Sequence, residues 1–187
     1  MFCFNKKYSA FWEIMKADTM RYVEHGELSA KWVNGGGKYL VANALLGCEH
    51  RLAFTFWFRL LSLAECRGLL RFMARFMYRK YSHKYGMQIP PGTQIGPGMY
   101  IGHGINIVIH GKTIIGRNCN LAHFMNIGSN HNTPAVVGDN VRFAPGVCVV
   151  ENVKIGSNVR IGAGTIIIHD VPDGATTVGN PNRIIIH

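Results

Sequence analysis

The chain has 187 residues, of which 48% are apolar and 16% charged, and its formal net charge is +10. Length and composition predict one compact globular domain or two small ones, and they exclude a disordered protein because the apolar content suffices for a sizeable core. The longest uncharged apolar stretch, residues 39–48, is about half of the roughly 20 residues that span a bilayer, so we expect no transmembrane helix.

The amino terminus has neither a long apolar run nor a small-residue cleavage site, so we expect no secretory signal and a cytoplasmic protein. The cysteines are far apart and form no CxxC pair, which favours free thiols over a disulfide framework or a zinc site. They are Cys3, Cys48, Cys66, Cys119 and Cys148. We therefore expect no bound metal.

Three helical segments are predicted in the first half of the chain. Residues 8–24 and 38–58 have helical character, with a loop at residues 35–37 between them. Residues 60–81 are predicted to form an amphipathic helix, because apolar residues recur there at three- and four-residue spacings and Gly86 follows as a stop. Those apolar residues are Leu63, Leu70, Met73 and Met77.

Basic residues concentrate in residues 51–87, which hold eight of the 20 Lys and Arg residues and one of the 10 acidic residues. Four arginines recur there every four residues, opposite the apolar positions: Arg67, Arg71, Arg75 and Arg79. Such a stripe fits a solvated helix face, or a peripheral contact with an anionic membrane or with a lipid-linked or acidic glycan. No nucleic-acid-binding motif accompanies it, so we expect no nucleic-acid partner.

The chain changes its sequence pattern near Gly86, since all seven prolines follow residue 89 and 17 of the 20 aromatic residues precede residue 88. Beyond that point an aliphatic or aromatic residue recurs every six positions, with a two-residue slip and one longer interruption. These positions are Ile89, Ile95, Ile101, Ile109, Ile115, Leu121, Ile127, Val137, Phe143, Val149, Ile155, Ile161 and Ile167. A period of six predicts a solenoid that turns a corner every six residues, a parallel β-helix. We therefore expect an α-helical region over 1–86 and a β-helix over 87–187.

The hexads, with the runs IGHGINIVIHGKTIIGRN and IGAGTIIIHDVPDGATTVGNPNRIII, resemble the hexapeptide-repeat acyltransferases. Within that superfamily the chain is most similar to serine acetyltransferases and to their relatives that O-acetylate bacterial surface polysaccharides. In the helical half, MKADTMRY and RLAFTFWFRL resemble the polysaccharide branch. The resemblance implies a left-handed β-helix, a homotrimer with active sites between neighbouring subunits, and acetyl-CoA as the acyl donor.

If three hexads make one coil, four of the hexad positions share one face of the solenoid. The residue two positions after each of them then lies along one edge, and these residues are His103, His123, Pro145 and Ala163. Adjacent coils lie about 4.8 Å apart, so His103 and His123 are expected to reach one small site. Transfer of an acetyl group from a thioester to an alcohol needs a general base, and imidazole titrates in the right range. His103 in YIGHG also matches the catalytic histidine of the family. For His123 a catalytic role and an ordinary turn position stay equally open.

Two positions depart from the serine acetyltransferase pattern. Gly102 stands where those enzymes have an aspartate before the histidine, and Thr133 stands where they have a second histidine before a proline. Residues 128–136 interrupt the hexads and are rich in turn formers, so this loop is expected to protrude beside the acceptor site. Asn130 and His131 are the candidate substrate-binding residues, and an exposed loop tip is the alternative for His131.

For the donor, the resemblance implies CoA contacts at six residues: Ala144, Gly162, Ala163, Ile168, His169 and Arg183. Tight turn geometry accounts equally well for Ala144, Gly162 and Ala163. Arg183 suits a CoA phosphate, and a solvated charge is the alternative.

These observations predict an acetyl-CoA-dependent O-acetyltransferase that transfers the acetyl group directly to a saccharide hydroxyl in surface polysaccharide biosynthesis. The departures at Gly102 and Thr133 favour the sugar. L-Serine O-acetylation in cysteine biosynthesis is the second hypothesis, and a non-catalytic β-helix scaffold is the third.

Overall fold

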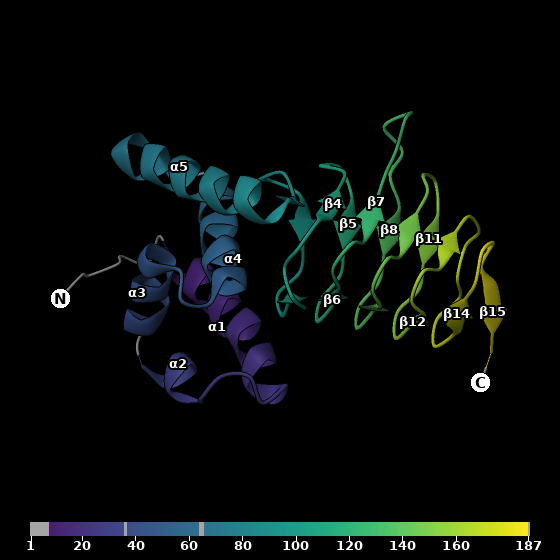
Figure 1. Cartoon of the computed structure of the whole chain (residues 1–187), viewed down its shortest axis with the longest axis horizontal. Helices are drawn as coiled ribbons and strands as arrows, with labels where there is room; N and C mark the ends of the chain where they lie inside the picture. The colour runs from purple at the N-terminus through teal and green to yellow at the C-terminus, as the bar shows by residue number, and fades with distance from the viewer. Residues whose placement is uncertain (1–7, 36, 64–65, 187) are drawn as a thin grey trace.

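The computed structural model describes residues 8–35, 37–63 and 66–186, where a group of helices lies at one end of a solenoid of short strands (Figure 1). The helices are α1 (Ser9–Glu24), α2 (Lys31–Asn34), α3 (Lys38–Leu46), α4 (His50–Leu61) and α5 (Gly68–Tyr85). The strands are β1 (Met87–Gln88), β2 (Gln94–Ile95), β3 (Tyr100–Ile101), β4 (Ile107–Ile109), β5 (Ile114–Ile115), β6 (Asn120–Leu121), β7 (Asn126–Ile127), β8 (Val136–Val137), β9 (Arg142–Phe143), β10 (Cys148–Val149), β11 (Lys154–Ile155), β12 (Arg160–Ile161), β13 (Ile166–Ile167), β14 (Thr176–Val178) and β15 (Arg183–Ile185).

The first predicted helix is confirmed as α1, but the bounds of the other two are wrong. The segment predicted at 38–58 breaks at Gly47, whose left-handed φ of 75° ends α3 before α4 begins. The segment predicted at 60–81 also breaks, because α4 runs to Leu61 and α5 begins only at Gly68, so Arg67 precedes α5. Gly86 ends α5, as predicted, and has a left-handed φ of 66°. Of the loop predicted at 35–37, Gly36 lies outside the described residues.

Helix α4 is the centre of the helical half. Every residue from Leu52 to Leu61 is buried, and α4 packs against α1, α3 and α5. Its polar residues Arg51, Thr55 and Arg59 recur every four residues along one face, and the two arginines donate to carbonyls of the first coil of the solenoid. Apolar residues also lie close beyond both ends of α4, so the sequence pattern did not mark where it begins and ends.

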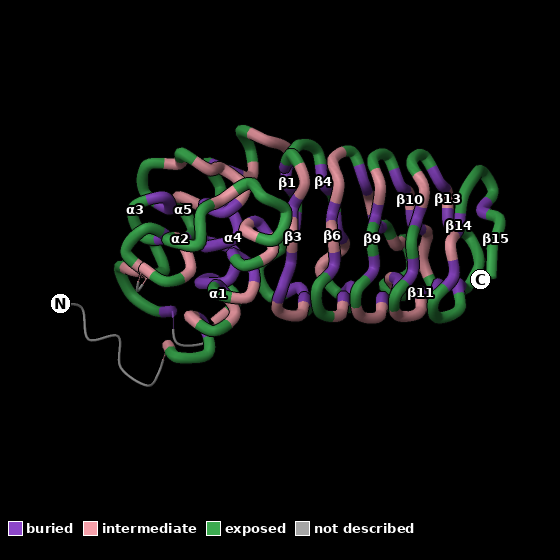
Figure 2. Tube along the Cα trace, turned by 90° about the horizontal axis from the view of Figure 1, so that it is seen from below, coloured by how far each residue is buried: buried purple, intermediate pink, exposed green. Residues whose placement is uncertain are grey.

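The second half is a left-handed parallel β-helix, as predicted. Its three faces are the sheets β1-β4-β7-β10-β13, β2-β5-β8-β11 and β3-β6-β9-β12-β14-β15, and every pairing except β14 with β15 is parallel. Arg142 pairs with Arg160, 18 positions later, which is the predicted three hexads per coil. All thirteen hexad positions are buried inside the prism, where Figure 2 shows the strands alternating between buried and less buried residues.

Asparagines with left-handed backbones form the corners of the prism. Asn118, Asn140 and Asn158 have φ values of 56°, 58° and 60°. Their side chains form a ladder in which Asn118 Nδ2 donates to Asn140 Oδ1 at 3.2 Å and Asn140 Nδ2 donates to Asn158 Oδ1 at 3.0 Å. Asparagine tolerates this conformation better than other side chains that have a Cβ, so these residues permit the bends.

A buried ion pair joins the helices to the first coil of the solenoid. Arg59 Nε donates to Asp18 Oδ2 at 2.9 Å, and Arg59 Nη2 donates to the carbonyl of Gly96 at 2.8 Å. Asp18 Oδ1 in turn accepts from the backbone N–H groups of Gly98 and Met99, each at 2.8 Å. The side chains of both halves form one continuous core.

Over the described residues, no helix is long and apolar enough to cross a membrane. Cys48, Cys66, Cys119 and Cys148 are free thiols, and Cys3 lies outside the described residues.

Candidate functional site

The corner between β3 and β4 brings the two predicted histidines together. The rings of His103 and His123 lie with their centroids 5.0 Å apart and their planes at 83°, so the edge of one ring faces the plane of the other. His103 follows β3 and His123 follows β6, the neighbouring strand of the same sheet. The solenoid geometry alone is therefore sufficient to pair them.

His103 itself sits in a left-handed turn. Its φ is 61°, and the two-residue slip in the hexads falls in the same connection, between Ile101 and Ile107. The N–H of Gly102 donates to the carbonyl of Leu121 at 2.8 Å, and the N–H of Gly104 donates to the carbonyl of Gly102 at 2.8 Å. These two N–H groups are already engaged, so they do not serve as an oxyanion hole.

The first residue of α4 holds this turn from the helical side. His50 Nε2 lies 3.0 Å from the carbonyl oxygen of His103, and because a carbonyl only accepts, Nε2 carries the proton and donates it. The His50 ring stacks on Tyr85 with centroids 4.1 Å apart. Gly104 is packed so closely here that an added Cβ would lie 2.7 Å from Arg51 Cγ. Sequence reasoning missed His50, since nothing in the pattern relates residues 53 positions apart.

His123 has a polar atom without a partner. Its Nδ1 is buried and makes no hydrogen bond within the described part of the chain. Buried polar groups are nearly always paired, so this nitrogen distinguishes His123 from an ordinary turn residue. Phe124 packs edge-on against the same ring at 5.3 Å and is itself half exposed.

Three of the predicted CoA contacts continue the column below the histidines. Ala144 follows β9, and Gly162 and Ala163 follow β12, in the same sheet as β3 and β6. Ala163 is exposed, whereas a Cβ on Gly162 would lie 2.8 Å from Val178 Cγ1. Close packing against Val178 therefore accounts for the glycine at position 162.

Two of the other three predicted CoA contacts lie at a different corner. Ile168 and His169 are exposed and follow β13, on a different sheet and so at the next corner. Arg183 is exposed at the start of β15, where it pairs with Val178 of β14, the residue against which Gly162 packs. One chain therefore brings Ala144, Gly162, Ala163 and Arg183 to the edge that carries the histidines.

The predicted loop between β7 and β8 stands out from the prism (Figure 1) and is organised by one carboxylate. Glu151 Oε2 accepts from the backbone N–H groups of Asn130 and His131, each at 2.8 Å, and from Ser129 Oγ at 2.9 Å. The other oxygen lies 2.7 Å from His131 Nδ1. These hydrogen bonds, foremost the one from the His131 backbone, lower the pKa of Glu151 to about 2. Sequence reasoning missed Glu151, which lies one coil further along.

This loop does not reach the histidine pair of its own chain. It connects the first sheet to the second, whereas His103 lies between the third sheet and the first. His131 points into solvent, with 81% of its side chain exposed. Asn130 and His131 thus lie at a different corner from His103.

No group of three or more His, Cys, Asp or Glu side chains that would suit a metal ion occurs among the described residues.

This chain is similar both to a known protein family and to a known enzyme sequence. Residues 134–169 match the family described as bacterial transferase hexapeptide (six repeats). The chain is 30% identical over 153 residues to "Serine acetyltransferase 1, chloroplastic" of Arabidopsis thaliana, a match that covers 79% of this chain. It spans 46% of that relative, about half its length.

Two solved structures share the fold over 96% of this chain. One is a serine acetyltransferase in complex with CoA, with a TM-score of 0.67, 18% identity and 73% of that chain covered. The other is serine acetyltransferase from Neisseria gonorrhoeae in complex with serine, with a TM-score of 0.71, 22% identity and 71% of that chain covered.

Proposed function

We propose that this chain, a serine acetyltransferase-like member of the hexapeptide-repeat acyltransferase superfamily, transfers an acetyl group from acetyl-CoA to a hydroxyl group. The observation that carries the proposal is the pair of His103 and His123 at one corner, 5.0 Å apart. A scaffold without activity would not need the buried and unpartnered ring nitrogen of His123.

In the proposed mechanism, His103 is the general base. The acceptor O–H gives its proton to the His103 imidazole as its oxygen bonds to the thioester carbonyl carbon. When the carbon–sulfur bond breaks, His103 returns that proton to the departing sulfur, so the histidine ends neutral. No covalent acyl-enzyme is needed, because the thioester is already activated.

The donor fits the column of small residues beside the histidines. When bound, acetyl-CoA supplies the activated acetyl group, and a pantetheine arm needs an edge without large side chains. Ala144, Gly162 and Ala163 provide that edge on the two coils beyond His123. We extend the proposal to Ile168, His169 and Arg183 as contacts for the rest of CoA, which has phosphates that suit Arg183.

For the acceptor, the similarity supports L-serine better than the saccharide that the sequence departures favoured. The relatives compared above are all serine acetyltransferases. The saccharide is the second candidate acceptor because two residues depart from the serine acetyltransferase pattern. Gly102 puts no carboxylate before the histidine, and Thr133 puts no imidazole before Pro134; its backbone carbonyl accepts from Asn152 N–H and its N–H donates to Ser129 Oγ.

The experiment is CoA release from acetyl-CoA by the purified chain, with L-serine in one arm and a panel of hydroxyl-bearing glycans in the other. Turnover with serine supports the first acceptor, and turnover with a glycan supports the second. A chain that binds acetyl-CoA but releases no CoA with any acceptor would support the scaffold.

We also propose a homotrimer, because the loop that carries Asn130 and His131 lies at a different corner from His103 of the same chain. A neighbouring subunit would bring this loop to the histidine pair and complete an acceptor site. Light scattering after size exclusion tests this proposal, with three times 20.8 kDa expected and an active monomer contradicting it.

A further inference from the structure

The outer face of α5 carries apolar side chains that none of the described residues covers. Leu69, Phe72 and Phe76 are 74%, 71% and 64% exposed, and Met73 is 41% exposed. Residues three or four positions apart lie on one side of a helix, so these four form a continuous stripe, which we call the apolar stripe. Surface residues of this size are unremarkable singly, but a contiguous group marks an interaction site.

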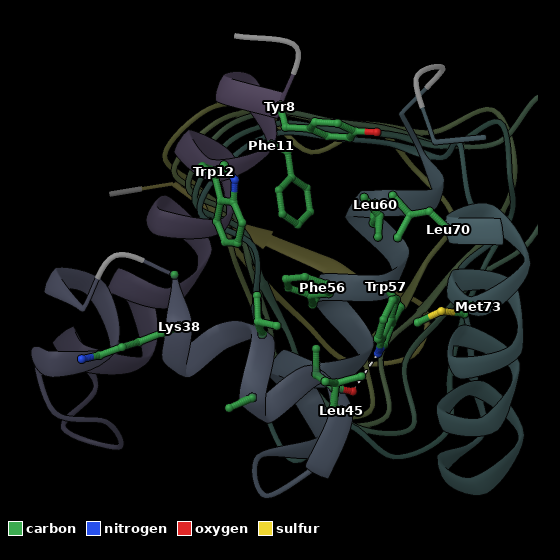
Figure 3. A pocket seen from close by; sticks show the side chains of 14 residues that line it. Tyr8, Phe11, Trp12, Lys38, Leu45, Phe56, Trp57, Leu60, Leu70 and Met73 are labelled. Carbon is green, nitrogen blue, oxygen red and sulfur yellow. Dashed lines mark hydrogen bonds between the residues drawn. The ribbon is translucent and has the colours of Figure 1, made fainter. Parts of the chain in front are cut away.

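The apolar stripe continues into a pocket of the helical half. Figure 3 shows this pocket between α1, α3, α4 and α5, with Leu70 and Met73 of α5 turned toward Leu60 and Trp57 of α4. Its volume is about 630 Å³. Leu45 and Val41 of α3 also line it and are 51% and 38% exposed. Exposed apolar side chains therefore lie on both sides of the opening.

The charge of α5 indicates what this surface binds. The helix contains five Lys and Arg residues and no Asp or Glu: Arg71, Arg75, Arg79, Lys80 and Lys84. Helical spacing places the three arginines along one flank of the apolar stripe. No described acidic side chain forms an ion pair with Arg75 or Arg79, so their charges are available to a partner.

We propose that the apolar stripe and its arginine flank dock on an anionic lipid bilayer, with the stripe at the level of the acyl chains and the arginines at the phosphates. An exposed apolar face with cations beside it is the pattern of helices that lie in a membrane interface. A twofold contact between copies of the chain suits this surface poorly, because two facing α5 helices would bring ten cations together. The proposal does not depend on the acyl-transfer reaction.

The experiment measures sedimentation of the full chain with phosphatidylcholine vesicles, with and without phosphatidylglycerol. We expect binding to the anionic vesicles only, and weaker binding at high salt. Arg75→Gln/Arg79→Gln should weaken binding about 30-fold, which is about fivefold for each arginine. Equal binding to both kinds of vesicle would overturn the proposal.

The apolar contribution is tested by Phe72→Ser/Phe76→Ser, which removes exposed side chains and should leave the melting temperature unchanged. We expect at least tenfold weaker binding to the anionic vesicles. Matched controls on the solenoid remove exposed residues of the same kinds, Arg142→Gln/Arg160→Gln for charge and Ile185→Ser/Ile186→Ser for apolar area. Both controls should bind like the unmodified chain.

Two results would assign the surface differently. Unchanged vesicle binding by Phe72→Ser/Phe76→Ser would exclude the apolar stripe from the contact. A fall in the solution mass of the same variant, with vesicle binding unchanged, would make the stripe a contact between copies of the chain.

Discussion

His103 combines a chemical role with an unusual backbone, so the choice of substitution decides what an experiment reports. With φ at 61°, alanine would add strain of about 1–2 kcal/mol that asparagine largely avoids. We therefore predict that His103→Asn folds normally and loses acetyl transfer by a factor of about 10² to 10⁴, the usual contribution of a general base. CoA release and thermal melting measure the two properties.

The matched control for that substitution is His83→Asn, on the exposed side of α5. It should keep the turnover of the unmodified chain. Near-normal turnover by folded His103→Asn would remove the base from the mechanism.

His50 acts on the reaction only through His103, and we assign it a positioning role. His50→Phe keeps a ring to stack on Tyr85 and removes the hydrogen bond to the His103 carbonyl. We expect kcat to fall about three- to tenfold, in line with the net value of one hydrogen bond, with KM for the acceptor unchanged. Steady-state kinetics measure this, and His50→Gln, which keeps an N–H donor, should recover part of the loss.

A merely structural role for His50 would give a different pattern. The melting temperature would fall and both variants would lose turnover together with stability. That result would contradict the positioning role.

At the scale of elements, the loop between β7 and β8 depends on Glu151 as a carboxylate. The folded pKa of about 2 lies below the ordinary value of 4.5, so the stabilisation is complete above pH 4.5 and is lost as the pH falls through 2. We predict that the amide resonances of Asn130 and His131 show no titration step near pH 4.5. Nuclear magnetic resonance between pH 7 and about pH 3.5 measures this.

Glu151→Gln keeps the shape of the side chain and removes its charge. We expect severalfold faster cleavage of the loop by a protease at neutral pH, because charge-assisted hydrogen bonds to two backbone N–H groups are weakened. A titration step at pH 4.5 in the unmodified chain, or equal cleavage of both proteins, would contradict the prediction.

The elements also show which structure could be predicted from the sequence. The six-residue period is local, so it predicted the buried hexad positions, the three-hexad coil and the pairing of His103 with His123. The break at Gly47 was missed because a single glycine within a helical pattern is also compatible with one continuous helix. The contacts of His50 and Glu151 were missed because they join residues 53 and 20 positions apart, whose approach depends on how whole elements pack.

For the whole molecule, the ion pair of Asp18 and Arg59 is the junction between the two halves. Asp18→Asn would leave the guanidinium buried without a counter-charge, which costs about 3–5 kcal/mol of unfolding free energy. Glu24→Gln is the control, because it breaks the exposed pair with Arg21 and should cost at most about 1 kcal/mol. Urea denaturation measures both. Equal effects would mean that the halves are held together by apolar packing alone.

The last strands of the chain determine how the solenoid ends. A parallel coil leaves unpaired N–H and C=O groups on its final turn, on which a further coil or another molecule can add. Here β15 runs antiparallel against β14, and the turn before it covers the edge of β13, since Ile166 N–H donates to Gly179 and Asn182 N–H donates to Ile166. The helices cover the opposite end. The antiparallel direction of β15 and the turn before it therefore prevent a further parallel coil from adding at the edges of β14 and β13.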